Sequence, residues 1–236
     1  MINKAIKTLS LSLCLVAGAS QATILDYYDT ITNGQNQFTT TVTNAGSAVS
    51  SVNLSGLSGG NSWDLGDFTI STTDGSYESV YGANVDNSTG EMIGIDPRDN
   101  NDNGAGSGLT FTFDSAVNAL GFEVGDWATC CFTSELFISF DGGTAIKVAS
   151  ATNVNDNPAT AAGGNAGDAF FVGAIDDSSQ FTTVTFFGNG FGEFLTAGGT
   201  IMYSALDVGS VTVPEPSTIA ILGLAMMGLS FSRRKA

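Results

Sequence analysis

The sequence predicts an all-β protein: a single β-sandwich, jelly-roll-like, flanked by an N-terminal signal helix and a short C-terminal transmembrane helix. Short segments rich in β-branched and aromatic residues alternate with Gly-, Asn- and Asp-rich turns about every 8–12 residues, which is typical of sandwiches. No part of residues 23–213 shows a sustained helical period. The chain of 236 residues also contains 30 glycines and few basic residues, which agrees with an exported all-β domain.

The individual strands are predicted from alternation and from turn residues. Alternation is cleanest in residues 109–113, where Leu109, Phe111 and Phe113 share one face. Asp74-Gly75 predicts a hairpin turn between neighbouring strands. The expected strands, in order, are residues 23–28, 37–43, 48–54, 63–70, 77–81, 91–95, 109–113, 117–124, 134–140, 144–148, 169–175, 180–187 and 200–208.

The N-terminal residues have the pattern of a secretory signal peptide. Lys4 and Lys7 form a positive region, and residues 9–16 form a short apolar segment. Ser20-Gln21-Ala22 fits a small-x-small cleavage site for signal peptidase, with Ala19 as the second choice of cut. The expected division is therefore a signal peptide at 1–22, one extracellular domain at 23–213 and a C-terminal segment at 214–236.

The C-terminal segment combines three physical parts. Pro214-Glu215-Pro216 is rigid and polar, residues 218–231 are apolar, and Arg233-Arg234-Lys235 is cationic. The apolar run would extend about 21 Å as a helix, which is short of a ~30 Å membrane core, so a buried helix is the alternative. The cationic cluster is expected to stop transfer and keep the end cytoplasmic.

This arrangement resembles the PEP-CTERM sorting signal of Gram-negative bacteria. The resemblance implies processing by a membrane protease of the exosortase type, in a host that usually makes exopolysaccharide. It also implies an inner-membrane-anchored precursor, held by its C-terminal helix until processing, and then a cell-surface or matrix location.

The charge of the domain is strongly acidic. The chain has 7 Lys+Arg and 23 Asp+Glu. Only Arg98 and Lys147 of the basic residues and all acidic residues except Glu215 lie in 23–213, so this region carries a formal charge of −20. Such a charge argues against binding nucleic acid or anionic lipid. It suits either solubility or the binding of a hard cation such as calcium.

One loop resembles the first half of a calcium-binding loop. Residues 99–104 read D-N-N-D-N-G, which fits D-x-[DN]-x-[DN]-G. The second half is missing, because the twelfth position is Thr110 and not a bidentate Glu. The alternative is a turn-rich loop whose side chains cap their own backbone. The candidate calcium ligands are Asp96, Asp99, Asn101 and Asn103.

Two adjacent cysteines and two tryptophans are further candidates. Cys130 and Cys131 could form a vicinal disulfide, remain thiols or bridge two chains. Trp127 and Trp63 could each stack on the apolar face of a sugar, or could belong to the core. Tyr77 and Tyr81 carry the same two alternatives, which their exposure would decide.

The domain shows a second, weaker resemblance. Residues 119–126, and 170–173 followed by 181–186, look like strands of the extracellular domains of PEP-CTERM proteins. Those domains resemble lectin-like or carbohydrate-binding-module-like jelly rolls. This resemblance supports the fold more than any function, because a fold alone does not fix an activity. The first functional hypothesis is a non-catalytic surface or matrix protein that associates with exopolysaccharide, for which carbohydrate binding would be one means.

Two other functions remain open at this point. Glu123 and Glu135 could serve as the carboxylate pair of a secreted glycan-active hydrolase, although Glu123 could equally face solvent from its strand. The chain has no histidine, which excludes a Ser-His-Asp triad. The remaining alternative is a purely structural or adhesive matrix protein without a sugar site.

Overall fold

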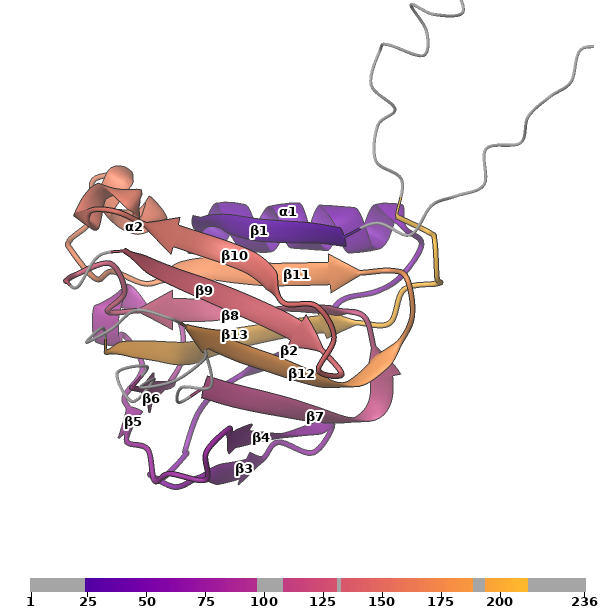
Figure 1. Cartoon of the computed structure of the whole chain (residues 1–236), viewed down its shortest axis with the longest axis horizontal. Helices are drawn as coiled ribbons and strands as arrows, with labels where there is room; N and C mark the ends of the chain where they lie inside the picture. Colours follow the sequence, from indigo (N-terminus) through magenta and orange to yellow (C-terminus); the bar gives the residue numbers. More distant parts are fainter. Residues whose placement is uncertain (1–23, 97–107, 131–132, 189–193, 212–236) are drawn as a thin grey trace, which may run out of the picture.

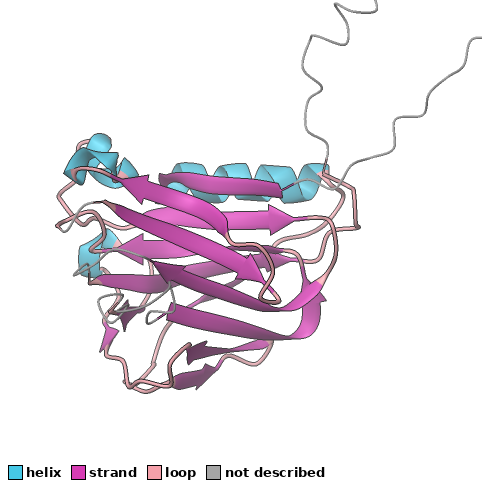
Figure 2. Ribbon diagram, in the orientation of Figure 1, coloured by secondary structure: helices cyan, strands magenta, loops and turns pink. Residues whose placement is uncertain are grey.

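The structure, a computed structural model, describes residues 24–96, 108–130, 133–188 and 194–211. Within these residues thirteen strands form two antiparallel sheets, accompanied by few helices (Figures 1 and 2). The predicted all-β class is confirmed. No helix in this part of the chain is long and apolar enough to cross a membrane. The predicted signal helix and transmembrane helix both lie outside the described residues.

The two sheets face each other and share most of the hydrophobic core. The seven-stranded sheet has the order β1-β11-β8-β13-β6-β5, with β2 paired to β13, and the six-stranded sheet has the order β10-β9-β12-β7-β4-β3. The strands of the first sheet are β1 (Ile24–Thr30), β11 (Phe170–Asp176), β8 (Ala119–Gly125), β13 (Leu195–Ser204), β6 (Met92–Ile95), β5 (Val80–Tyr81) and β2 (Ser50–Asn53). Those of the second are β10 (Ile146–Ala151), β9 (Ser134–Phe140), β12 (Phe181–Gly188), β7 (Gly108–Val117), β4 (Phe68–Thr72) and β3 (Ser62–Asp64).

Aromatic rings join the two sheets across this core. Leu109, Phe111 and Phe113 of β7 are all buried, as their alternation predicts. The Phe111 ring stacks on Phe122 of β8 with centroids 5.3 Å apart, and Phe122 meets Phe186 of β12 edge-on at 4.9 Å. Offset and edge-on ring pairs are favourable beyond their buried area, so these contacts help to fix the spacing of the sheets.

The predicted strand at residues 37–43 is wrong, because these residues belong to the helix α1 (Ile31–Asn44). Its Thr residues favour strands, but Gly34, Phe38 and Val42 recur every four residues and form a buried helical face. This face packs on the outer side of the seven-stranded sheet, where Phe38 meets Tyr27 at 5.4 Å and Phe171 at 5.9 Å between centroids. Tertiary packing therefore overrides local propensity here.

The predicted hairpin at Asp74-Gly75 is also wrong. The turn itself forms, with Gly75 at φ 75°, but the strands on its two sides enter different sheets: β4 pairs with β3 and β7, whereas β5 pairs with β6. The true hairpin lies one turn earlier, where Gly66 at φ 89° divides the expected strand 63–70 into β3 and β4. Short helical turns not predicted from sequence are η1 (Val85–Asn87), η3 (Val154–Asp156) and α2 (Pro158–Ala161).

The described chain begins and ends at the same corner of the molecule, beside the C-terminal end of α1 (Figure 1). Val211, the last described residue, packs with Phe38, Val42 and Leu206 in a second hydrophobic core between α1 and the seven-stranded sheet. The last described residue of the domain therefore lies directly next to α1.

Candidate functional site

Most of the candidate site residues predicted from sequence lie outside the described part of the chain. These are Pro214, Glu215, Pro216, Arg233, Arg234, Lys235, Asp99, Asn101, Asn103 and Cys131. Cys130 is disulfide-bonded, and its pairing with Cys131 stays a prediction. Among the described residues, Asp96 included, no three His, Cys, Asp or Glu side chains are grouped as a metal site. The calcium site therefore also stays a prediction.

Of the two alternatives for Trp127 and Trp63, sugar stacking or a place in the core, their burial favours the core. Trp127 is 0% exposed, and its Nε1 donates to Ser134 Oγ at 2.8 Å. Trp63 is 6% exposed, and its Nε1 donates to the Ser58 carbonyl at 2.7 Å. Both indoles are core residues with satisfied N–H groups and offer no open face. The exposed rings are instead Tyr77, at 72%, and Tyr81, at 36%.

Glu123 and Glu135 do not form a carboxylate pair. Each alternates with residues of the shared core, so Glu123 points from the outer face of one sheet and Glu135 from the outer face of the other. Two layers of strands lie between them. Glu135 forms an exposed ion pair with Lys147 at 3.0 Å.

Glu123 is a buried structural carboxylate. It accepts hydrogen bonds from the Thr89 backbone N–H at 2.8 Å, the Thr200 backbone N–H at 3.0 Å and the Thr89 hydroxyl. These bonds fasten the loop that contains η1 to the middle of the seven-stranded sheet. Burial raises the pKa of Glu123 above its ordinary value, although the bonds from Thr89 and Thr200 oppose the shift.

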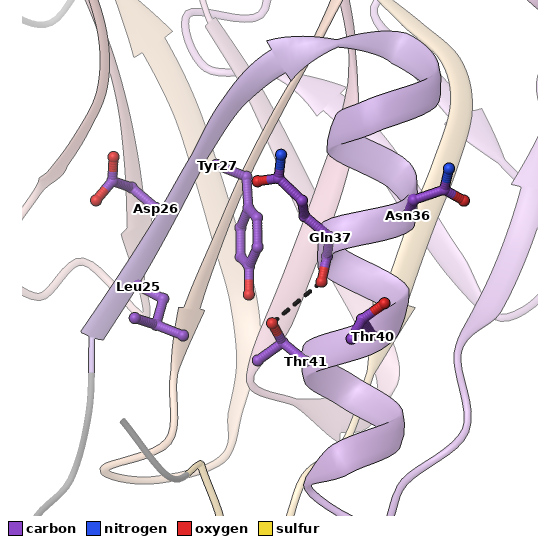
Figure 3. Close-up of a pocket in the computed structure, with 7 residues that line it drawn as sticks. All are labelled: Leu25, Asp26, Tyr27, Asn36, Gln37, Thr40 and Thr41. Atoms are coloured by element: carbon purple, nitrogen blue, oxygen red, sulfur yellow. Dashed lines mark hydrogen bonds between the residues drawn. The ribbon is translucent and has the colours of Figure 1, made fainter. Parts of the chain in front are cut away.

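A shallow groove between β1 and α1 is one candidate for a binding site. Its volume is about 460 Å³, which lies in the range of small-ligand pockets. Figure 3 shows Tyr27, Gln37 and Thr41 lying between the strand and the helix, while Asp26 and Asn36 point away on either side. The lining residues are Leu25, Asp26, Tyr27, Asn36, Gln37, Thr40 and Thr41.

The local sequence explains how this groove is built. Strand β1 passes directly into α1, which turns back alongside it (Figure 3). Leu25 and Tyr27 are two residues apart and share one face of β1, while Gln37 and Thr41 are one helical turn apart on α1. Gln37 Nε2 donates to Asp29 Oδ2 at 2.8 Å, and Thr41 Oγ1 donates to the Gln37 carbonyl at 3.1 Å. Both helix side chains are thereby held in place.

Tyr27 places a buried polar group beside the groove. The residue is only 6% exposed, and among the described residues its hydroxyl has no partner at hydrogen-bonding geometry. Burial raises the pKa of Tyr27; the neighbouring Thr41 hydroxyl lowers it less strongly, and Asp26 raises it further. The phenol therefore stays neutral at physiological pH, and its hydroxyl lies buried beside Thr41 and not open to the groove.

Sequence reasoning missed Asn36, Gln37, Thr40 and Thr41, because it assigned residues 37–43 to a strand. The signal that could have found them is the four-residue recurrence of Gly34, Phe38 and Val42, which places the polar residues between them on the open side of a helix.

A second hollow of about 410 Å³ lies where β2 and β13 meet the end of β7. Its main feature is a hydrogen bond from the Tyr203 hydroxyl to Asp67 Oδ2 at 2.6 Å, which links the two sheets. Burial, followed by this bond, raises the pKa of Tyr203 to about 12.

Comparison with known proteins identifies the C-terminal segment. The family model of the PEP-CTERM protein-sorting motif matches residues 212–235. The chain therefore carries the sorting motif that its sequence predicts, which supports an exported precursor sorted by exosortase. No curated protein matches the chain.

The similar solved structures are all distant. The catalytic unit of a GH87 α-1,3-glucanase from Streptomyces thermodiastaticus is 12% identical, with a TM-score of 0.32 over 64% of this chain and 28% of that one. A family 29 carbohydrate-binding module is 12% identical, with a TM-score of 0.34 over 71% and 99%. The Agl-KA catalytic domain is 14% identical, with a TM-score of 0.34 over 70% and 31%. The chain thus spans less than a third of the two catalytic units, and likeness at this level does not establish a shared fold.

Proposed function

We propose that this protein is an exosortase-processed surface or matrix protein that binds exopolysaccharide without catalysis, through the groove between β1 and α1. The observation that carries the proposal is a groove of about 460 Å³ whose described lining combines hydrogen-bonding side chains with the apolar side chain of Leu25.

The remaining lining of the groove suits a saccharide. Sugars carry many hydroxyl groups on a ring with apolar C–H faces, so they are recognised by neutral hydrogen-bonding side chains beside apolar surface. The groove offers the Gln37 amide, the Thr40 hydroxyl and the Leu25 side chain. None of the described residues that line it is basic.

Binding without catalysis is favoured over hydrolysis by the placement of the two predicted carboxylates. A glycoside hydrolase generally needs two carboxyl groups within about 10 Å of each other. Glu123 and Glu135 project from opposite outer faces of the two sheets, and Glu123 is engaged with Thr89 and Thr200. In this proposal neither residue is catalytic.

The position of the groove agrees with the sorting route. It adjoins the corner at which the C-terminal segment is attached, so processing at that segment would take place beside it. The proposed sequence of events is cleavage by signal peptidase after Ala22, anchoring through residues 218–231, exosortase processing at Pro214-Glu215-Pro216, and association with the matrix. The proposal also keeps two expectations from the sequence: a jelly-roll-like arrangement of the strands and a calcium site.

Replacing Gln37 by Ala in the domain comprising residues 23–213, which contains both hydrophobic cores, should separate binding from stability. Gln37 is exposed and lines the groove, so the variant should change in stability by less than about 1 kcal/mol. Its affinity for exopolysaccharide from the producing cells should fall about 3–10-fold, the loss of one neutral hydrogen bond. Calorimetry of binding and urea unfolding would measure the two effects.

The control is Tyr203→Phe, which removes a hydroxyl outside the groove. This variant should lose about 1 kcal/mol of stability and keep its affinity. Unchanged binding by Gln37→Ala, or a complete lack of binding by the wild-type domain, would refute the proposed function.

A further inference from the structure

The helix α1 lies in a part of the chain that has no charged side chain. Residues 30–63 contain no Asp, Glu, Lys or Arg, although the domain as a whole is strongly acidic. Burial does not account for this, because α1 is exposed on the sides that do not face the sheet. We infer that α1 holds a neutral polysaccharide chain along its length. The inference rests on the proposed function and names the class of its ligand.

One stripe along α1 consists of amide and hydroxyl side chains. Positions three and four apart lie on the same side of a helix. The four helix residues that line the groove form the middle of the stripe (Figure 3), and Asn33 and Asn44 continue it by one turn at each end. The stripe extends about 17 Å at 1.5 Å per residue, so it is longer than one sugar unit. Its members are Asn33, Asn36, Gln37, Thr40, Thr41 and Asn44.

The side chains of the stripe match the hydroxyl groups of a sugar chain. An amide offers donors and an acceptor, and a hydroxyl offers one donor and two lone pairs, so each can bond to a sugar hydroxyl in either direction. A ligand can reach them, because all members of the stripe except the half-buried Thr41 are exposed. Each neutral hydrogen bond that is added raises affinity about 2–10-fold, so affinity should rise with chain length until the stripe is covered.

The stripe is held in place before a ligand arrives. Gly34 faces the sheet and lets the helix approach closely, since a Cβ there would lie 2.6 Å from Cδ1 of Phe171. Asp29 of β1 accepts hydrogen bonds from Gln37 Nε2 at 2.8 Å and from Asn33 Nδ2 at 3.4 Å. A preorganised surface loses less conformational entropy on binding, which favours even a shallow site.

The charges around the stripe select a neutral chain. Asp26 and Asp29 border it on β1, and the described basic residue, Lys147, is paired with Glu135 on the other sheet. A uronate or a sulfated sugar would approach this acidic domain without a cation to meet it. An uncharged chain avoids this repulsion, and its hydroxyl groups replace the water that leaves the amides and hydroxyls of the stripe.

Calorimetric titration of the domain of residues 23–213 with fractions of the producing cells' exopolysaccharide tests the inference. Anion exchange separates a neutral from an acidic fraction, and partial hydrolysis of the neutral fraction gives fragments of graded length. We expect the neutral fraction to bind at least about tenfold more tightly than the acidic fraction, and affinity to rise with fragment length.

Substitutions at the two ends of the stripe show whether the chain extends beyond the groove. Asn33→Ala and Asn44→Ala should each lower the affinity for long fragments about 3–10-fold and leave that for the shortest binding fragments unchanged. The matched control is Gln35→Ala, which removes an uncharged side chain on the opposite side of α1 and should not change binding at any length. None of the three positions is buried, so all three variants should remain folded.

The outcomes distinguish the two claims. Equal or tighter binding of the acidic fraction would overturn the inference and leave the proposed function standing. An affinity that does not change with fragment length, or end variants that bind long fragments as well as Gln35→Ala does, would also overturn the inference alone. A domain that binds neither fraction would refute the proposed function as well.

Discussion

Replacing Glu123 by Ala should lower the free energy of unfolding by about 2–5 kcal/mol. The change leaves the buried N–H groups of Thr89 and Thr200 without acceptors and opens a cavity over Gly199, whose backbone lies against the carboxylate. The loop around η1 loses its attachment to β8, so its amides should exchange with solvent faster than those of the strands. Urea unfolding and amide hydrogen exchange would measure both effects.

Two further variants sharpen this test. Glu123→Gln keeps one acceptor oxygen and should cost only about 1–2 kcal/mol. Glu135→Ala removes the other predicted carboxylate, whose ion pair with Lys147 is exposed, and should change stability by less than about 1 kcal/mol. If Glu123→Ala unfolded at the same urea concentration as wild type, the structural role assigned to Glu123 would be wrong.

The same carboxylate should make stability depend on pH. Because burial raises the folded-state pKa of Glu123 above its ordinary value of 4.5, its contribution is fully present below the unfolded pKa and is lost as the pH rises through the folded pKa. Wild type should therefore lose stability relative to Glu123→Gln as the pH is raised from about 4.5. A constant difference between the two proteins across this range would contradict the raised pKa.

Deleting residues 214–236 should move most of the protein from the cell envelope into the medium. The segment contains the matched sorting motif and the apolar residues 218–231 proposed as the anchor. The domain retains the two cores that the structure describes, because Val211 and the other described core residues precede the deletion. Cell fractionation with detection of the domain would measure the shift.

A second variant distinguishes anchoring from processing. Replacing Pro214, Glu215 and Pro216 by Ala leaves the apolar segment in place, so the protein should remain in the membrane at its unprocessed mass. Mass spectrometry of the retained protein would show whether residues 217–236 are still attached. If the deletion variant were held in the envelope as firmly as wild type, the sorting role would be refuted.

The strands were predictable where one face of a strand is buried, since period-two alternation is then visible in sequence. Residues 109–113 illustrate this, because Leu109, Phe111 and Phe113 all enter the core. Alternation says nothing about which strands pair, and so the turn at Asp74-Gly75 was mistaken for a hairpin although it connects two sheets. Pairing depends on contacts between residues distant in sequence.

The candidate site was not predictable because it depends on α1. The Thr-rich segment 37–43 has the local preference of a strand, and only burial of Phe38 against Tyr27 and Phe171 decides for a helix. Trp127 and Glu123 also could not be assigned from sequence. Residue type alone suggested that Trp127 stacks on a sugar and that Glu123 is a catalytic acid. Their burial arises from Phe170 in one case and from the loop at Thr89 in the other.

The central claim is that the groove between β1 and α1 is where this domain holds a saccharide. Its most direct test is a titration of isotopically labelled residues 23–213 with fragments of the producing cells' exopolysaccharide, followed by backbone amide chemical shifts. The account predicts that the largest changes fall on residues 25–27 and 36–41. Changes centred on the exposed rings of Tyr77 and Tyr81, with none along α1, would contradict it.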